Sequence, residues 1–420
     1  MGNAADEHPL LAENAPEASP KTAPPSDKLW TPTFVAGMAI NFLIMANYFI
    51  PMVVVTDYAM EEYGAGEALA GMVASIFIVG ALVSRLASGA LIAKIGSRKL
   101  LAAGLVAEVV FSALYFLDLG LYPLMALRLV HGFSYGAASS AVGTAVTAII
   151  PDAHKGEGVG YYMLSNTLGT AVGPLLGMAI SQSLGIHGVF AGCVVTAVAS
   201  FAALFAFRPN IAPRKKRAAA SDARDRGIRA IIEPAAVPIS ISTCLVFFGY
   251  SAVLTFLTPF AAQVGLSDAA SFFFVAYALA MFVSRLFTGK IFDQRGALVV
   301  MVPSFVLAAT GFALIGAAPN GVVLIAGAAV LGFGVGTVQS CSLTIAVQQV
   351  SVRRLSYANS TFYAMNDLGV GLGPLVLGLV IPALGYRGLY LTMAGVVAVA
   401  FAWYLVVEWR MRRALNIQDA

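Results

Sequence analysis

The sequence predicts an all-α membrane protein with twelve transmembrane helices in two pseudo-symmetric six-helix bundles, and three observations lead to this fold class. The composition is strongly apolar: of 420 residues, 59% are hydrophobic and 11% are charged, against about 25% charged residues in an average soluble domain. The apolar residues form long runs, and about 20 such residues can cross a bilayer as a helix. Several short motifs also recur at an offset of 200 residues.

Twelve apolar runs follow a polar N-terminal segment. We expect the spans at 33–56, 68–92, 99–117, 121–149, 157–181, 186–207, 232–258, 268–291, 297–317, 320–349, 355–382 and 386–408. Residues 1–28 are rich in Pro, Ala and acidic side chains, so we expect a disordered cytoplasmic tail. The expected organisation is this tail, a first bundle (29–208), a basic cytoplasmic linker (209–231), a second bundle (232–410) and a cytoplasmic tail (411–420).

The positive charges predict the orientation. Apart from Arg85, Arg128, Arg285 and Arg387, the Lys and Arg residues lie on the side shared by both termini and the linker. Because cytoplasmic loops carry the excess of Lys and Arg, we expect both termini in the cytoplasm and the protein in the plasma (inner) membrane. The basic linker is interpreted as a solvated segment at the membrane face, so no nucleic-acid partner is expected.

The repeat relates the two halves. Val83-Ser-Arg-Leu recurs as Val283-Ser-Arg-Leu, and the segment from Gly169 to Gly177 recurs from Gly369 to Gly378. Six spans return the chain to its starting side, so the two halves have parallel topologies. Glycines four apart allow helices to approach closely, and we expect this packing role for residues of both copies: Gly169, Gly173, Pro174, Gly177, Gly369, Gly373 and Pro374.

These motifs together resemble the Major Facilitator Superfamily, in particular its twelve-helix drug/proton antiporter group. The loop from Gly89 through Gly96 to Arg98 is similar to the signature loop between helices two and three of that family. Arg128-x-x-His131-Gly resembles its Arg-x-x-Gln-Gly motif, and the Gly169–Gly177 segment resembles the antiporter motif. The resemblance implies two parallel halves that rock around a site near the bilayer midplane.

The signature loop departs from the family pattern. The usual Asp is Ala93 in the first half, whereas the second half keeps Asp293 beside Arg295. The resemblance implies that such an Asp caps a helix and pairs with a cation at the cytoplasmic gate. We therefore expect the gate to depend more on the second half. His131 also stands where the family usually has Gln, and this change affects the possible protonation chemistry of helix four.

Polar residues form stripes on several predicted spans, and a polar stripe in a membrane helix is expected to face a water-filled cavity. In the family's arrangement these stripes would surround one central cavity. The candidate substrate residues are Asn41, Asn47, Tyr48, Arg128, His131, Tyr135, Asn166 and Tyr363. Packing between helices is an equally good interpretation of several of these side chains.

Two acidic residues lie well inside spans and are candidates for proton coupling. Asp367 is the first and Glu108 the second, although Glu108 can equally form a structural pair with a cation. Burial favours the neutral form of a carboxyl group and a nearby Arg128 would favour the charged form. His131 is a further candidate, because an unperturbed imidazole titrates near neutrality. Arg85 and Arg285 lie towards the cytoplasmic ends of their spans, where we expect them to extend to the interface.

Other classes of protein fit less well. The chain has no Gly-Lys-Ser/Thr of an ATP-driven pump, and its three cysteines lack metal or disulfide spacing. We therefore expect neither an enzyme nor a cofactor or metal. The favoured function is proton-coupled efflux of a small amphipathic or hydrophobic molecule by a monomer. A proton-coupled importer, a sugar or metabolite exporter of the same fold, and a non-transporting membrane sensor are the alternatives.

Overall fold

The computed structural model describes residues 28–418 with the exception of 53, 66, 119 and 210–230, and the described chain is almost entirely helical. Of the predicted N-terminal tail and basic linker, only Lys28, Pro209 and Ile231 are among the described residues. The first half contains α1 (Pro32–Met52), α2 (Val55–Tyr63), α3 (Glu67–Ile95), α4 (Ser97–Leu114), η1 (Tyr115–Leu117), α5 (Leu121–Ile149), η2 (Asp152–His154) and α6 (Lys155–Ala203).

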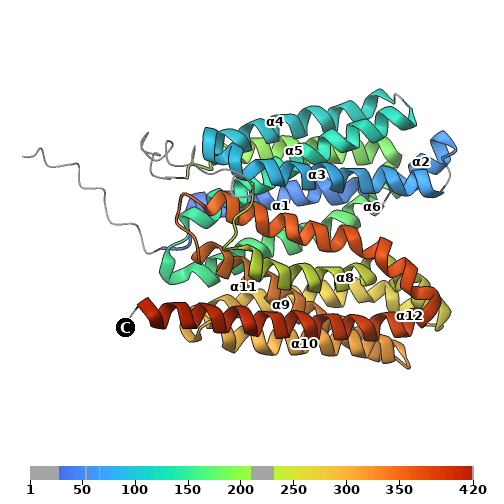
Figure 1. Cartoon of the computed structure of the whole chain (residues 1–420). Coiled ribbons are helices and arrows are strands. Elements are labelled where there is room, and N and C mark those ends of the chain that lie inside the picture. The colour runs from blue at the N-terminus through green and yellow to red at the C-terminus, as the bar shows by residue number, and fades with distance from the viewer. Residues whose placement is uncertain (1–27, 53, 66, 119, 210–230, 419–420) are drawn as a thin grey trace, which may run out of the picture.

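The second half contains α8 (Val237–Gln263), α9 (Ser267–Arg295), α10 (Ala297–Ala317), α11 (Gly321–Gln348) and α12 (Leu355–Gln418). The helices of each half gather into one bundle, and the two bundles lie side by side with their long axes roughly parallel (Figure 1). Within the bundles, α1 packs along α6 and α8 packs along α12. The fold class predicted from the sequence is thereby confirmed.

Two glycines divide the longest helices into pairs of spans. Gly185 interrupts α6 with a φ of 66°, and Gly385 interrupts α12 with a φ of 64°. Side chains with a Cβ atom rarely adopt this left-handed conformation, so glycine is the residue that allows the sharp reversal. The two positions are 200 residues apart, and each is where the chain turns between the fifth and sixth spans of its half.

Among the described residues, nine helical segments are apolar and long enough to cross a membrane, and one of them holds both spans of α6. The remaining two predicted spans are α5 and the first part of α12. Those two helices carry central polar residues, including Arg128 on α5 and Asp367 on α12.

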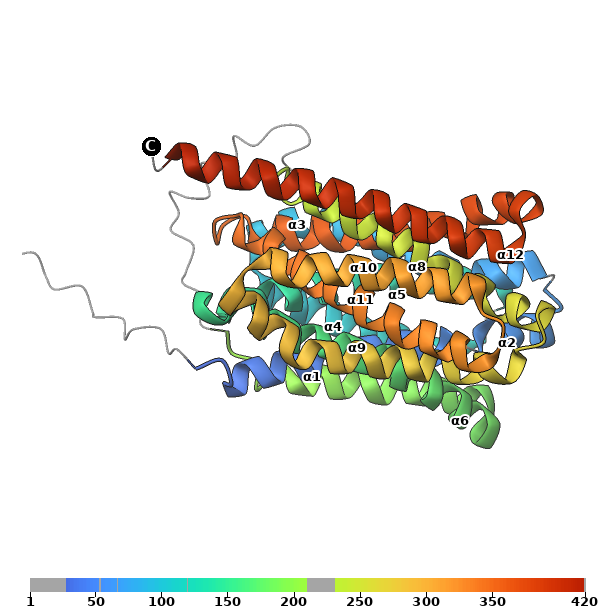
Figure 2. The same cartoon turned by 90° about the horizontal axis from the view of Figure 1, so that it is seen from below.

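The start of α1 and the end of α12 lie at the same end of the molecule, as both views show (Figures 1 and 2). We call this the terminal end and the other the opposite end. At the opposite end the halves differ, because the predicted first span ends early at Met52 and continues as the separate helix α2. The equivalent helix α8 runs without a break to Gln263.

Candidate functional site

An ion pair joins the two bundles at the centre of the molecule. Arg85 Nε on α3 lies 2.6 Å from Asp367 Oδ2 on α12. The Arg85 side chain is 4% exposed, whereas that of Asp367 is 23% exposed. Two charges this close and this poorly solvated attract each other far more strongly than a surface pair. The pair therefore links the two bundles through an interaction that depends on the charge of one carboxyl group.

Aromatic rings surround the pair. The Arg85 guanidinium lies 5.0 Å from the ring centre of Tyr363 and 5.5 Å from that of Tyr135. Tyr135 also packs against Tyr48 and Phe77, at 5.2 Å and 5.3 Å between ring centres, and the Tyr48 and Phe77 rings are stacked 4.7 Å apart. Tyr48, Tyr135 and Tyr363, three of the residues expected to line a cavity, are therefore brought together around Arg85 by α1, α5 and α12.

A set of amide and hydroxyl groups lies beside the aromatic cluster, between α1 and α6. Asn41 Nδ2 donates to Asn166 Oδ1 at 2.6 Å and to Ser165 Oγ at 2.8 Å. The Tyr162 hydroxyl donates to Asn41 Oδ1 at 3.0 Å. The structure thus pairs two of the expected cavity residues, Asn41 and Asn166, with each other.

A second inter-bundle contact involves Arg285 on α9, which is 2% exposed. Its Nη1 donates to the Met163 carbonyl oxygen and, at 2.5 Å, to Thr167 Oγ1, both on α6. Its Nη2 donates to Gln339 Oε1 on α11 at 2.7 Å. These acceptors are all uncharged. Arg285 is therefore a buried cation held by neutral oxygen atoms.

The other predicted acid lies elsewhere, inside the first bundle. Glu108 on α4 is 3.1 Å from His131 Nε2 and accepts a hydrogen bond from Ser134 Oγ at 3.1 Å. The other ring nitrogen of His131 is 2.8 Å from the Tyr115 hydroxyl. All of these side chains are buried. The partner of Glu108 is therefore the His131 imidazole rather than an Arg or Lys side chain, and this cluster does not contact Asp367.

Two further candidates also face the interior of the first bundle. Arg128 donates to the Val73 carbonyl at 3.2 Å and lies 4.8 Å from the ring centre of Phe77. Asn47 Nδ2 donates to the Cys193 carbonyl at 2.6 Å, and so ties α1 to the second part of α6. Asn47 does not join the central set, because its amide group is directed at α4 and α6.

The terminal end is closed by contacts between the bundles. Asp293 accepts hydrogen bonds from the backbone N–H groups of Gly156, at 2.7 Å, and Glu157, at 2.8 Å. These are N–H groups at the start of α6, which have no partner within that helix, so α9 supplies the helix cap from the other bundle. Ser356 on α12 donates to the Gly89 carbonyl on α3 at 3.1 Å.

The remaining members of the predicted gate lie around these contacts. Gly96 and Gly296 have φ angles of 88° and 85° and allow the tight turns after α3 and α9. Arg98 and Arg295 are exposed at the terminal end. The position of Ala93 is equivalent to that of Asp293, and it provides no side-chain acceptor for the start of α12.

The glycine segments lie where helices approach closely. A Cβ atom added to Gly169 or Gly173 would meet the side chains of Met45 and Phe49 on α1. In the second half, a Cβ on Gly369 would meet the Cys244 carbonyl of α8, and one on Gly373 would meet Ser251. Pro174 and Gly177 lie in α6 and Pro374 in α12, within the same segments.

Two expectations about charged residues are wrong. Arg85 and Arg285 do not extend to the interface, because each reaches across to the other bundle and is buried. The cation beside Asp367 is Arg85 rather than Arg128, which turns towards α3 within its own bundle. Thr167, the partner of Arg285, is a residue that the sequence analysis missed. The repeat was the available signal, because the two arginines lie 200 residues apart and Thr167 lies 200 residues before Asp367.

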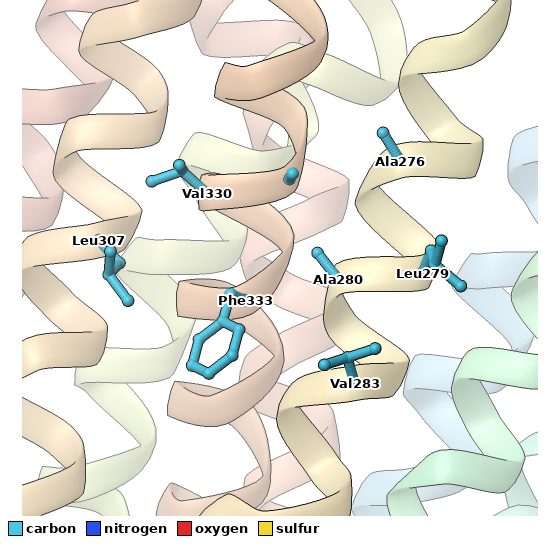
Figure 3. Close-up of a pocket in the computed structure, with 8 residues that line it drawn as sticks. Ala276, Leu279, Ala280, Val283, Leu307, Val330 and Phe333 are labelled. Atoms are coloured by element: carbon cyan, nitrogen blue, oxygen red, sulfur yellow. The ribbon is translucent and has the colours of Figure 1, made fainter.

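An apolar groove of about 510 Å³ lies between α9, α10 and α11. Its lining includes Leu279, Val283, Leu307, Val330 and Phe333 (Figure 3). Leu279 is 63% exposed, which is expected of a side chain that faces lipid. This groove is on the outer side of the second bundle and contains none of the central polar residues.

Comparison with known proteins agrees with this architecture. The family described as the Major Facilitator Superfamily matches residues 37–356 and 239–416. The chain is 26% identical over 390 residues to the uncharacterized MFS-type transporter YhhS of Escherichia coli K12, covering 90% of this chain and 92% of that protein. It is also 26% identical over 415 residues to the uncharacterized MFS-type transporter BMASAVP1_A0869 of Burkholderia mallei, covering 95% and 98%.

Solved structures with the same fold are more distant in sequence. The human organic anion transporter MFSD10 (TETRAN) superposes with a TM-score of 0.73 at 17% identity, covering 89% of this chain and 98% of that chain. The transporter FucP in the outward conformation superposes with a TM-score of 0.67 at 15% identity, with the same coverage.

Proposed function

The chain belongs to the Major Facilitator Superfamily of transporters, and we propose that it moves a small amphipathic or hydrophobic molecule in a cycle coupled to a proton on Asp367. Members of this family transport solutes and are not enzymes, as the sequence predicted. The proposal concerns the finer points: coupling, direction and the class of substrate.

The observation that carries the proposal is the ion pair between Arg85 and Asp367. It is an ion pair between the two bundles, and it lies beside the rings of Tyr135 and Tyr363. A proton on Asp367 would remove the attraction and leave a neutral carboxyl group against the guanidinium. Protonation therefore weakens the contact between α3 and α12, and the energy of closing the terminal end depends on one proton.

Besides the central ion pair, the bundles are in polar contact at the terminal end, where Asp293 caps α6 and Ser356 donates to the Gly89 carbonyl. Asp367 nevertheless keeps 23% of its side-chain surface exposed, so this carboxyl group is not sealed off by the contact with Arg85. This conformation is therefore closed at the terminal end. In the cycle we propose, the protonated transporter opens that end, binds its substrate, and releases substrate and proton after the end has closed again.

The positive charges around the terminal end support a cytoplasmic location for it and for both termini. A cycle that loads from this side exports its substrate, and we propose efflux across the plasma (inner) membrane by a monomer. Because proton and substrate cross together in this cycle, unlike in an antiporter, an outward gradient of the substrate drives efflux and an inward proton gradient favours import. Import through the same cycle is the alternative. The predicted domain boundaries, 29–208 for the first bundle and 232–410 for the second, are part of this proposal.

The test is transport in vesicles with an imposed pH gradient. A panel of toxic compounds, compared in cells with and without the gene, supplies the transported compound. We expect a pH gradient to change the transport rate of the wild type and to have no effect on Asp367→Asn. Glu108→Gln, which changes the other buried acid, serves as the matched control and should keep its response. A response that persists in Asp367→Asn contradicts the proposal.

A further inference from the structure

The two halves of the chain differ at one pair of equivalent contacts. Arg85 and Arg285 occupy the same position of the repeated Val-Ser-Arg-Leu motif. Arg85 pairs with Asp367 on α12, and Arg285 donates to Thr167 on α6. Residues 167 and 367 are also separated by the repeat offset of 200. The second contact therefore has a hydroxyl group where the first has a carboxylate.

Arg285 consequently lacks an anionic partner among the described residues. The titratable groups that face it are Tyr277 on its own helix, Tyr363 on α12 and Cys341 on α11. Its hydrogen-bond acceptors are neutral, and its Nε has no partner in the described part of the chain. A buried charge without a counter-charge is unfavourable even when its hydrogen bonds are satisfied. A negatively charged ligand would remove this imbalance.

Opening of the terminal end would make both arginines available to a ligand. Two acceptors of Arg285, the Met163 carbonyl and Thr167, belong to the other bundle, as does the Asp367 partner of Arg85. Separation of the bundles removes these partners. The Arg85 guanidinium lies 5.0 Å from the ring centre of Tyr363. A Cβ atom on Gly143 would meet both Tyr363 and Tyr162. The carbonyl of the residue after Tyr162, Met163, accepts from Arg285. Both cations therefore lie around the contact region of Tyr162 and Tyr363.

We propose that the substrate carries a carboxylate or a similar monovalent anionic group, which is held between Arg85 and Arg285 while Asp367 carries a proton. This rests on the proposed proton coupling at Asp367. The charged and titratable groups that face Asp367 are Arg85 on α3, Tyr135 on α5 and Tyr48 on α1. The rings of Tyr48, Phe77 and Tyr135 provide an apolar surface for the rest of the molecule.

The order of binding and release follows from these charges. An anion at Arg85 replaces the negative charge that Asp367 loses on protonation, so proton and anion favour each other's binding. When the terminal end closes, both arginines recover their protein partners and the anion is released. The proton and the anion therefore travel in the same direction, and exchange of the two in opposite directions would contradict the inference.

The experiment uses three aromatic probes that differ in charge: benzoate, neutral benzamide and cationic benzylamine. They are added to the purified full-length protein in detergent, in weak buffer with a pH indicator. We expect benzoate alone to raise the melting temperature and to withdraw protons from solution. Equal melting-temperature shifts for the three probes, or no response to benzoate, would overturn the proposal.

A substitution in the other bundle separates anion binding from general damage to the fold. Thr167→Asp gives Arg285 the carboxylate that Arg85 already has, and the new ion pair should preserve folding. We expect this change to weaken benzoate binding by about tenfold or more, whereas Thr167→Asn, a neutral change of similar size, should have a small effect. Unchanged benzoate affinity in Thr167→Asp would count against the anion site.

Asp367→Asn distinguishes this inference from the proposed function. The variant should bind benzoate without withdrawing protons from solution. Benzoate binding without proton uptake in the wild type would contradict the proton coupling and leave the anion site standing. Transport driven by a pH gradient in a protein that does not respond to benzoate would contradict the anion site and leave the coupling standing.

Discussion

At the scale of single residues, Asp367 illustrates what a sequence can indicate and where tertiary structure is needed. A carboxyl group inside an apolar run is conspicuous, because its burial is costly unless it is paired or functional. Its partner depends on how the two bundles face each other, which no local pattern records. Arg85, ten residues before the end of α3 at Ile95, has the sequence features of a side chain that extends to the interface.

The first prediction concerns the coupling energy of this pair. Removal of either charge, by Arg85→Gln or Asp367→Asn, leaves the other charge without its partner. For a fully buried pair this lowers the free energy of unfolding by about 3–5 kcal/mol. We expect a smaller loss here, because Asp367 is partly exposed. The double variant should be more stable than the sum of the two losses predicts, as measured by thermal unfolding. Additive losses would show that the charges do not interact.

The second prediction separates the two acids. Glu108 holds His131 and Ser134 within the first bundle, so Glu108→Gln should lower stability by about 1–3 kcal/mol by disturbing buried hydrogen bonds. His131→Gln should do the same. Both variants should keep the wild-type dependence of transport on pH, measured in vesicles. A shifted pH optimum in either variant would assign the cluster a role in coupling.

At the scale of helices, the positions of the spans could be predicted because about 20 apolar residues are needed for each crossing. The break between α1 and α2 was not predicted. Pro51 lies near the end of α1 and Pro259 near the end of α8, yet only the first half changes direction there. α2 packs by Tyr58 against Phe190, and such a tertiary contact is not visible in the local sequence.

The third prediction tests close packing between α8 and α12. A Cβ on Gly369 would collide with the backbone of α8, whereas one on Gly371 would meet nothing within 4 Å. Gly369→Ala should therefore lower stability by about 1–3 kcal/mol through overpacking and reduce transport. Gly371→Ala, two residues along the same helix, is the control and should resemble the wild type. Thermal unfolding and vesicle transport measure both effects, and equal behaviour of the two variants would exclude the packing role.

The fourth prediction tests the helix cap at the terminal end. Loss of a capping side chain costs about 0.5–2 kcal/mol, so Asp293→Ala should shift the protein towards the conformation that is open there. Ala93→Asp should have the opposite effect, because it places a carboxylate at the equivalent position before α12. The reactivity of a cysteine introduced at Asn359, which is fully buried between the bundles, reports the opening in a cysteine-free background. Equal reactivity in both variants would argue against a role of the cap.

At the scale of the whole molecule, the repeat of 200 residues correctly indicated two equivalent bundles. It also located the equivalent contacts made by Arg85 and Arg285, although the bundle interface itself could not be derived from either half alone. The difference between Asp367 and Thr167 gives the two contacts different charges. We interpret this difference as the reason why, of these two contacts, only the one between Arg85 and Asp367 responds directly to protons, whereas Arg285 is left without an anionic partner among the described residues.

The most direct test of the account measures the distance between the bundles at the terminal end as a function of pH. Spin labels at Lys94 and Arg353, both exposed there, report this distance by double electron–electron resonance. We predict that acidification lengthens it in the wild type, because a proton on Asp367 removes the ion pair with Arg85. Asp367→Asn should show the long distance at every pH. A distance that changes with pH equally in both proteins, or in neither, would contradict the claim that Asp367 couples protonation to closure.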